Sequence, residues 1–435
     1  MTTAATGMPR LWSREIDLVD IVVAGARVID PIEQIDTTLD VTIKDGVITD
    51  IEPARESRPR LLLTPGFVDP HVHLRVPGRE DEEDIASGTA AAAAGGYCTI
   101  LAMPNTDPVL DSASMLGSLI DDAKAHANIP VGFLAAITRG LRGEELTEMI
   151  ELAEGGAVGF TDDGRPIRSA GLMRRALQYS GAAGRTLSLH EEETTLSCGG
   201  HMHEGAISAE LGLGGWPSIA ESLMIERDIS LAQYESRPAH FMHLSAAESV
   251  EALRLGREAG VEVSGEVSPH HLCLTDDSIH ALDTNFKMNP PLRTEADRRS
   301  LIEGLRDGVI EAIATDHAPH ALHEKELPFE EAPFGVTGLE TAFPSLYTRL
   351  VLPGTLSLDV LVERMTSGPA RIFGLAPPRI AVGEKANLTL IDVEQEWIVG
   401  EEGFRSKSAN SWLLGERLTG RVVMTVAAGR LAYAA

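Results

Sequence analysis

Two histidines and an arginine alternate along one short stretch of the sequence, "GFVDPHVHLRVPG", residues 66–78. If this stretch continues a β-strand, its alternation directs His71, His73 and Arg75 to the same face. Imidazole nitrogens are common zinc ligands, so two histidines on one face could hold one metal ion. Alone, the pattern is equally typical of a strand end with solvated polar side chains. The rest of the chain must separate these two interpretations.

Polar residues also end other apolar runs, in "SLHEE", "FMHLS" and "IATDHAPH". We interpret His190 and His243, each after such a run, as ligands of a second metal. Asp316 follows the last run, where a carboxylate could contact the first metal and pass protons to and from a bound hydroxide. Four histidines with two aspartates exceed the needs of one structural site, so two Zn²⁺ ions are favoured over one. Further polar residues that follow apolar runs are Asn105, Asp162, Asp163, His270, His271 and His317.

The elements that must position these residues are eight apolar runs, each followed by a helix or by a loop and a helix. Such an order predicts an α/β fold of the (β/α)8 TIM-barrel type, whose active sites lie at the C-terminal ends of the strands. The polar residues named above fall at those ends, as a shared site requires. The eight runs are "GFVDPHVHL", "YCTILAMPN", "VGFLAAIT", "AVGFTDD", "TLSLHEE", "HFMHLS", "VEVSGEVSP" and "EAIATDH".

The two ends of the chain have a different character, with short alternating strands and hairpin turns such as "KDG" and "AAGR". Neither end alone has enough strands to bury a core. We therefore predict one small β-sandwich domain built from both termini. In this division residues 1–66 and 371–435 contribute the two parts of the sandwich, and residues 67–370 form the barrel.

Composition excludes several classes of function. A formal net charge of -28 argues against nucleic acid as a partner, because phosphate backbones require a basic surface. An anionic substrate would need local cations to bind. Three scattered cysteines are too few for a disulfide framework and indicate a reducing cytoplasm. The N-terminus lacks the apolar core of a signal peptide, and no stretch reaches the ~18 apolar residues of a membrane span. We expect a cytoplasmic protein that is not embedded in a membrane.

The motifs together are more specific than any one of them. "DPHVHLRVPG", "MPNTDP", "TDDG", "LHEE", "MHLS", "EVSPHHL", "FKMNPPLR" and "ATDHAPH" resemble, in this order, the amidohydrolase superfamily and in particular its bacterial class I dihydroorotases. The resemblance covers nearly the whole chain. It implies a zinc enzyme that interconverts L-dihydroorotate and N-carbamoyl-L-aspartate in de novo pyrimidine (UMP) biosynthesis. It further implies that metal-bound hydroxide attacks the ring amide.

Carried over residue by residue, the resemblance implies His71 and His73 on one metal, His190 and His243 on the other, and Asp316 as metal ligand and catalytic acid/base. Many relatives bridge the metals with a carboxylated lysine on the fourth strand, but that strand here reads "AVGFTDDG". An aspartate must therefore bridge if two metals bind. The family's spacing to the histidine of the fifth strand favours Asp163, with Asp162 as the alternative.

The resemblance also implies a set of substrate contacts around the metals. Arg75 would be a cationic fork for the substrate carboxylate, and asparagine side chains would supply both donors and acceptors for a ring amide. The segment 318–338, rich in Pro and Gly, is either a loop that covers the substrate or an ordinary surface connection. The implied contacts are His73, Arg75, Asn105, Asn289, His320, Phe334 and Gly335.

Two other functions share many of these features. A hydantoinase- or allantoinase-type cyclic amidase would have the same fold and metals, but the missing lysine weighs against it. A non-catalytic scaffold for aspartate transcarbamoylase would be expected to lose metal ligands, whereas every expected position is filled. We expect a small-molecule substrate, a homodimer or larger assembly, and aspartate transcarbamoylase as a candidate partner. The sequence leaves metal number and oligomeric state open.

Overall fold

The computed structural model describes residues 8–435. Residues 1–7 lie outside this range. They begin both the predicted segment 1–66 and the N-terminal stretch that we expect to lack a signal peptide. Within it, the strands of the two termini are β1 (Ile21–Asp30), β2 (Ile35–Lys44), β3 (Val47–Pro53), β4 (Leu61–Pro65), β15 (Leu388–Ile398), β16 (Arg417–Ala427) and β17 (Arg430–Ala434).

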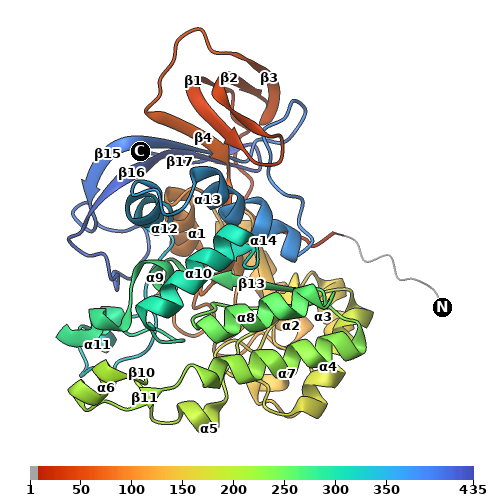
Figure 1. Cartoon of the computed structure of the whole chain (residues 1–435). Coiled ribbons are helices and arrows are strands. Elements are labelled where there is room, and N and C mark those ends of the chain that lie inside the picture. Colours follow the sequence, from red (N-terminus) through yellow and green to blue (C-terminus); the bar gives the residue numbers. More distant parts are fainter. Residues whose placement is uncertain (1–7) are drawn as a thin grey trace.

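The terminal strands form one seven-stranded sheet in the order β17-β16-β15-β4-β1-β2-β3. The antiparallel pairing of β4 with β15 joins the two ends of the chain, with Pro65 opposite Leu388. Figure 1 shows the first strands and the last strands side by side above the rest of the molecule. Both termini therefore build one β unit, as the strand patterns predict.

This terminal sheet folds over a core of its own. The β2–β3 turn at Gly46 and the β16–β17 turn at Gly429 touch, because a Cβ on Gly46 would lie 2.6 Å from the Gly429 carbonyl oxygen. The ends of the sheet are thus brought together although its hydrogen bonding is continuous. Between them lie apolar side chains from both halves of the chain: Val23, Ala26, Val28, Val41, Ile43, Ile48, Leu63, Ile380, Ala386, Leu388, Met424 and Val426.

The middle of the chain forms an eight-stranded parallel barrel in the order β14-β13-β12-β9-β8-β7-β6-β5. A bridge between Val72 and His317 brings the first and last strands together. Each of the eight predicted runs overlaps one of these strands, so the barrel prediction is confirmed. The strands are β5 (Phe67–Val72), β6 (Tyr97–Ala102), β7 (Val131–Ala135), β8 (Gly159–Phe160), β9 (Thr186–Leu189), β12 (Ala239–Phe241), β13 (Val263–Val267) and β14 (Ala312–Ile313).

Helices surround the barrel strands, and their ends follow local sequence signals. Asp84 caps the first helix through the Ser87 N–H, and Thr294 caps a later one through the Asp297 N–H. Apolar faces of the helices pack on the barrel in one large core. The outer helices are α1 (Ile85–Ala94), α2 (Ala113–His126), α3 (Met149–Gly155), α4 (Ala170–Ala183), α7 (Ile219–Glu235), α8 (Ala247–Glu258), α10 (Glu295–Asp307), α13 (Leu358–Met365) and α14 (Ser367–Ile372).

Two insertions meet beyond the C-terminal ends of the strands. One follows β9, and the other follows β14. The rings of Trp216 and Phe334, one from each insertion, contact edge to face with centroids 6.1 Å apart. The shorter elements after β9 are α5 (Thr194–Ser197), β10 (Met202–His203), α6 (Ala206–Leu211) and β11 (Gly215–Trp216), and those after β14 are α11 (Leu322–Lys325) and α12 (Ala342–Leu346). The short helix α9 (Pro269–Cys273) follows β13.

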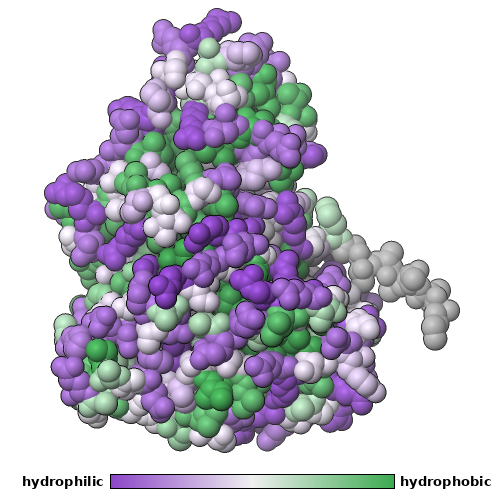
Figure 2. All heavy atoms as spheres, viewed as in Figure 1, coloured by the Kyte–Doolittle hydropathy of each residue, from purple (hydrophilic) through white to green (hydrophobic). Residues whose placement is uncertain are grey.

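The outer surface is mainly polar. Figure 2 shows hydrophilic side chains over much of the visible face, with apolar side chains in separate patches between them. Within residues 8–435, no helix has the length and apolarity that crossing a membrane requires.

Candidate metal centre and substrate cavity

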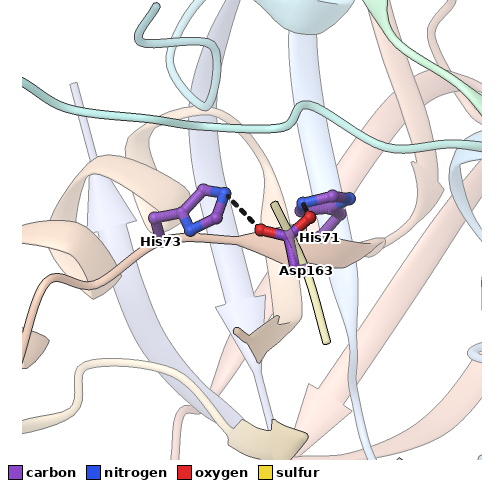
Figure 3. A group of neighbouring side chains, drawn as sticks. All are labelled: His71, His73 and Asp163. Atoms are coloured by element: carbon purple, nitrogen blue, oxygen red, sulfur yellow. Dashed lines mark ion pairs between the residues drawn. The ribbon is translucent and has the colours of Figure 1, made fainter. Parts of the chain in front are cut away.

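The carboxylate of Asp163 lies among four buried imidazoles at the C-terminal ends of the barrel strands. Its Oδ1 is 3.6 Å from His71 Nε2, 3.6 Å from His190 Nδ1 and 3.8 Å from His243 Nε2. Its Oδ2 is 3.6 Å from His73 Nε2. Figure 3 shows the Asp163 carboxylate between the rings of His71 and His73. Strands β5, β8, β9 and β12 therefore deliver five side chains to one place.

These side chains form two potential metal sites that share one aspartate. His71, His73 and Asp163 make one group, and Asp163, His190 and His243 make the other; in each group the ligand atoms lie within 4.8 Å of one another. His71 Nε2 is buried without a hydrogen-bond partner, which is rare for a polar atom in a folded protein. Imidazoles with a bridging carboxylate are suitable ligands for zinc. The residues therefore fit one or two such ions.

The charges of the centre also favour a cation. Burial opposes protonation of His190, but its hydrogen bonds with Asp163 and Glu192 raise its pKa to about 9. Burial likewise opposes protonation of His71, yet the charges of Asp316 and Asp163 raise the pKa of His71 well above its usual value. Positive charge is thus stabilised here in spite of the low dielectric, whether a proton or a metal ion supplies it.

Asp316 reaches the same centre from the end of β14. Its Oδ1 lies 3.2 Å from His73 Nε2 and 3.4 Å from His71 Nε2. The residue has a φ of 48°, an uncommon conformation for a non-glycine residue and one that recurs at functional sites. Burial would raise the pKa of Asp316, but the charge of His71 holds that pKa well below its usual value. The carboxylate is therefore ionised.

Asp162 has a different role from its neighbour. Its carboxylate accepts the Ile137 N–H at 2.8 Å and the Thr138 N–H at 2.9 Å, together with the Thr138 hydroxyl. These bonds tie the end of β8 to the end of β7. The structure thus brings Asp163, and not Asp162, to the histidines.

Glu266 on β13 supports the centre and was not predicted. Its Oε1 lies 2.9 Å from His71 Nδ1, and its Oε2 lies 3.0 Å from His240 Nε2. Burial would raise the pKa of Glu266, but the hydrogen bonds from His240 and His71 lower it to about 2. An ionised carboxylate only accepts, so His71 donates through Nδ1 and Nε2 is the ring nitrogen that faces the site. The inward position of Glu266 in "VSGEV" is the only sequence signal for this role.

Asn105 orients His73 in the same way. Its amide nitrogen donates to Asp163 Oδ2 at 2.8 Å, which leaves its oxygen, 2.9 Å from His73 Nδ1, to accept. His73 therefore also presents Nε2 toward Asp163. Asp69 accepts the His71 N–H at 3.2 Å and the Thr315 hydroxyl at 2.6 Å, and so holds the ends of β5 and β14 together.

A cavity of about 160 Å³ lies beside the potential metal ligands. The structure brings to it all of the expected substrate contacts. The Asn289 side-chain oxygen is buried and has no hydrogen-bond partner among residues 8–435. The cavity is lined by His73, Arg75, Asn105, Asp163, Gly164, His190, His243, Asn289, Asp316, Ala318, His320, Phe334 and Gly335.

Arg75 is fixed on one wall of this cavity. Its Nε donates to the Pro319 carbonyl at 3.0 Å and lies 3.1 Å from a Glu82 oxygen. His320 Nε2 lies 2.8 Å from the Phe334 carbonyl, so that nitrogen is the donor and Nδ1 is left without a partner. Glu82, His320 and Glu324 are close enough to hold an ion. Arg75 forms an ion pair with Glu82, however, so its guanidinium already supplies the positive charge at this group.

The remaining strand-end histidines have other partners. His317 Nε2 lies 3.2 Å from Glu83, and its Nδ1 accepts the Gly338 N–H at 3.1 Å. His271 Nε2 donates to the Pro290 carbonyl at 3.0 Å. His270 is buried, and burial lowers its pKa well below the usual value, so it is neutral. None of the three belongs to a potential metal group in the described part of the chain.

Comparisons with known proteins find similarity to the same family that the sequence motifs resemble. A family model described as "Dihydro-orotase-like" matches residues 60–249. The dihydroorotase of Geobacter sp. (strain M21) is 44% identical over 425 residues, which cover 96% of this chain and 100% of the relative. The dihydroorotase of Anaeromyxobacter sp. (strain K) is 46% identical over 422 residues, with 94% and 97% covered.

Among solved structures, the L-hydantoinase (dihydropyrimidinase) from Arthrobacter aurescens is similar with a TM-score of 0.84 and 26% identity, covering 95% of each chain. The dihydropyrimidinase from Brevibacillus agri NCHU1002 has a TM-score of 0.81, with 21% identity and 95% of each chain covered. At that lower identity the likeness establishes the fold alone.

Proposed function

The chain belongs to the dihydroorotase family, and from this premise we propose that it interconverts L-dihydroorotate and N-carbamoyl-L-aspartate, a step of de novo pyrimidine biosynthesis. The observation that carries the proposal is the position of Asp163 and Asp316 among four histidines, beside a cavity that is also lined by the half-buried Arg75. Hydrolytic groups and an anion-binding group around one cavity are what a cyclic amide with a carboxylate requires.

We propose that His71, His73 and Asp316 hold one zinc ion, that His190 and His243 hold a second, and that Asp163 bridges them. Zinc in such a set lowers the pKa of water toward ~7 and polarises a carbonyl group. Glu266 and Asn105 contribute by fixing the ring nitrogens of His71 and His73 toward the ions.

Asp316 is the proposed acid and base. In the ring-opening direction it accepts a proton from the attacking water as the new C–O bond forms. It then donates that proton to the ring nitrogen as the C–N bond breaks. Its ionised state and its position against both histidines of the first metal support this role. Ring closure is the reverse of these steps.

The substrate carboxylate is proposed to bind Arg75, whose guanidinium can form two parallel hydrogen bonds. Asn289 and His320 offer polar groups to the ring amide and ureido atoms, and Phe334 and Gly335 contribute backbone groups. Because the chain carries a net charge of -28, an anionic ring needs local positive charge, which Arg75 and the proposed zinc ions would supply.

Further proposals concern the compartment, the assembly, a partner protein and the domain boundaries. We propose a cytoplasmic homodimer or larger assembly, with aspartate transcarbamoylase as a candidate partner. We also propose residues 1–66 with 371–435 as one domain and 67–370 as the other. Helix α14 (Ser367–Ile372) crosses the second boundary. Because the helix packs on the barrel strand β5, its last residues belong with the barrel by their contacts.

The deciding experiment is ring opening of L-dihydroorotate by protein of measured zinc content, before and after chelation. We expect turnover that is lost with zinc and restored by adding it. A panel with hydantoin, dihydrouracil and allantoin is the control for specificity. Faster opening of a neutral ring than of dihydroorotate would overturn the substrate assignment, and zinc-loaded protein without any turnover would favour the scaffold alternative.

A further inference from the structure

Two buried lysines hold one segment of the loop that follows β14. Lys287 Nζ donates to the carbonyls of Phe329 at 2.6 Å, Glu330 at 3.1 Å and Ala332 at 2.7 Å. A second lysine binds the carbonyl groups that follow in the same segment. Lys325 Nζ donates at 3.0 Å to the carbonyls of residues 333 and 335. The two ammonium groups together hold five carbonyls of residues 329–335.

These lysines are unusual because they are buried without acidic partners. Lys287 is 2% exposed and Lys325 is 7% exposed, and within residues 8–435 no carboxylate forms an ion pair with either one. Burial lowers the pKa of Lys287 to about 8 and that of Lys325 to about 7. Burying an ammonium group is costly, so it is tolerated where its donors are all satisfied. Lys287 has three donors, and the three carbonyls occupy them.

The segment they hold forms part of the cavity wall. His320 donates to the Phe334 carbonyl at 2.8 Å, so among carbonyls 329–335 only that of Glu331 lacks such a side-chain donor. The Gly335 N–H donates to the Lys287 carbonyl at 2.9 Å. The Phe334 N–H, by contrast, has no acceptor among the described residues, and Phe334 lines the cavity.

The conformation of this segment also depends on Gly335. Its φ is 117°, and a Cβ there would lie 2.6 Å from Ala318 Cβ. The backbone therefore approaches the strand-end loop more closely than any side chain would allow. The ring of Phe334 lies over the Lys287 ammonium, with its centroid 4.5 Å from Nζ. Glycine, aromatic ring and lysine thus fix the same turn.

We propose that Lys287 and Lys325 are positioning residues, which hold residues 329–335 so that the Phe334 N–H faces an anionic part of the substrate. Carbonyl oxygens repel an anion, and the lysines engage these oxygens while adding positive charge behind the segment. The substrate named here rests on the proposed function. The ordering of the loop by the lysines does not depend on that function.

The test compares Lys287→Met and Lys325→Met with Lys44→Met, a control on the exposed side of β2. In each lysine variant we expect the KM for L-dihydroorotate to rise roughly 10-fold while kcat stays within about 3-fold, because a binding contact is lost and the chemical groups are kept. Zinc content should equal that of the wild type. Hydrogen exchange of peptides covering 326–337, measured without substrate, should accelerate roughly 10-fold.

Exchange that stays at the wild-type rate in both variants would overturn the inference, whatever the turnover. A fall in kcat at constant KM would also overturn it, since the lysines would then act on the chemistry. If Lys287→Met does not fold, Lys325→Met decides the question, because it removes two of the five bonds. Wild-type protein without turnover would refute the proposed function, and the exchange comparison would still test whether the lysines order the loop.

Discussion

Glu266 Oε1 lies 2.9 Å from His71 Nδ1, and no other side chain binds that nitrogen in the described part of the chain. The contact joins β13 to β5 across the barrel, between residues 195 positions apart in the sequence. It fixes which imidazole nitrogen faces the proposed metals. The affinity for metal should therefore depend on a residue that touches no metal.

We predict that Glu266→Gln binds zinc roughly 10- to 100-fold more weakly than the wild type, because an amide cannot accept from both His71 and His240. Competition with a chromophoric chelator measures the affinity. Glu262→Gln, the same change at an exposed position before β13, should leave it unchanged. Equal affinities for both variants would show that Glu266 does not tune the site.

The two neighbouring aspartates should separate metal binding from stability. We predict that Asp163→Ala loses zinc but keeps its fold, because the surrounding histidines can become neutral once the carboxylate that favours their protonation is gone. We predict that Asp162→Ala keeps zinc but loses about 2–4 kcal/mol in free energy of unfolding, since it leaves donors of Ile137 and Thr138 unpaired. Zinc analysis and urea unfolding of both proteins check this. The reverse pattern would reassign the bridging ligand.

We predict that Asp316→Ala lowers kcat roughly 10³-fold for dihydroorotate opening, in line with the loss of a general acid and base. Circular dichroism and the unfolding midpoint should stay close to those of the wild type, because the side chain faces the cavity. Asp277→Ala, at an exposed position on the same side of the barrel, is the control. Unchanged kinetics in Asp316→Ala would remove this residue from the mechanism.

Glu340 should make stability depend on pH. Burial raises its pKa to about 7, although its carboxylate accepts the Arg405 N–H at 2.9 Å and the Ser406 N–H at 3.2 Å. Between its usual pKa of 4.5 and about 7, the folded state holds a proton that the unfolded state has lost. The free energy of unfolding therefore falls as pH rises through this window.

Glu340→Gln cannot ionise, so we predict that it gains about 1–2 kcal/mol relative to the wild type between about pH 5 and about pH 8. Urea unfolding at both pH values, at matched zinc content, measures the difference. Glu401→Gln, an exposed change in the turn after β15, should follow the wild type. Parallel pH profiles for Glu340→Gln and wild type would contradict the prediction.

The barrel could be predicted from the sequence because each strand is an apolar run that ends in a polar residue. His190 and His243 show why this pattern of apolar runs with polar ends is sufficient to predict a shared site. Parallel strands of one barrel end on the same side, so strand-end residues meet whatever their separation along the chain. The choice between Asp162 and Asp163 is harder to derive. β8 is only two residues long, and the alternation of side chains is lost where the strand ends.

The buried contacts of the supporting residues could not be predicted, because the sequence around each charged residue does not identify its distant partner. Glu266, Lys287 and Lys325 look like surface charges in "SGEV", "NFKMN" and "HEKE". Each becomes buried through groups distant in sequence, as Glu266 does through His71. The loop 318–338 was expected either to cover the substrate or to be a simple connection. Its contacts with Lys287 and Lys325 depend on the path of the chain after β13. No local sequence pattern predicts that path.

The pairing of β4 with β15 has a consequence for the newly made chain. β4 leaves the ribosome before any barrel strand, and β15 leaves after all of them. Throughout that interval one edge of β4 carries unpaired N–H and C=O groups, since β15 is their only partner on that side among the described residues. Open strand edges recruit other chains. Nascent molecules that stall or are cut within the barrel should therefore be prone to aggregation, because β15 is not there to cover the edge of β4.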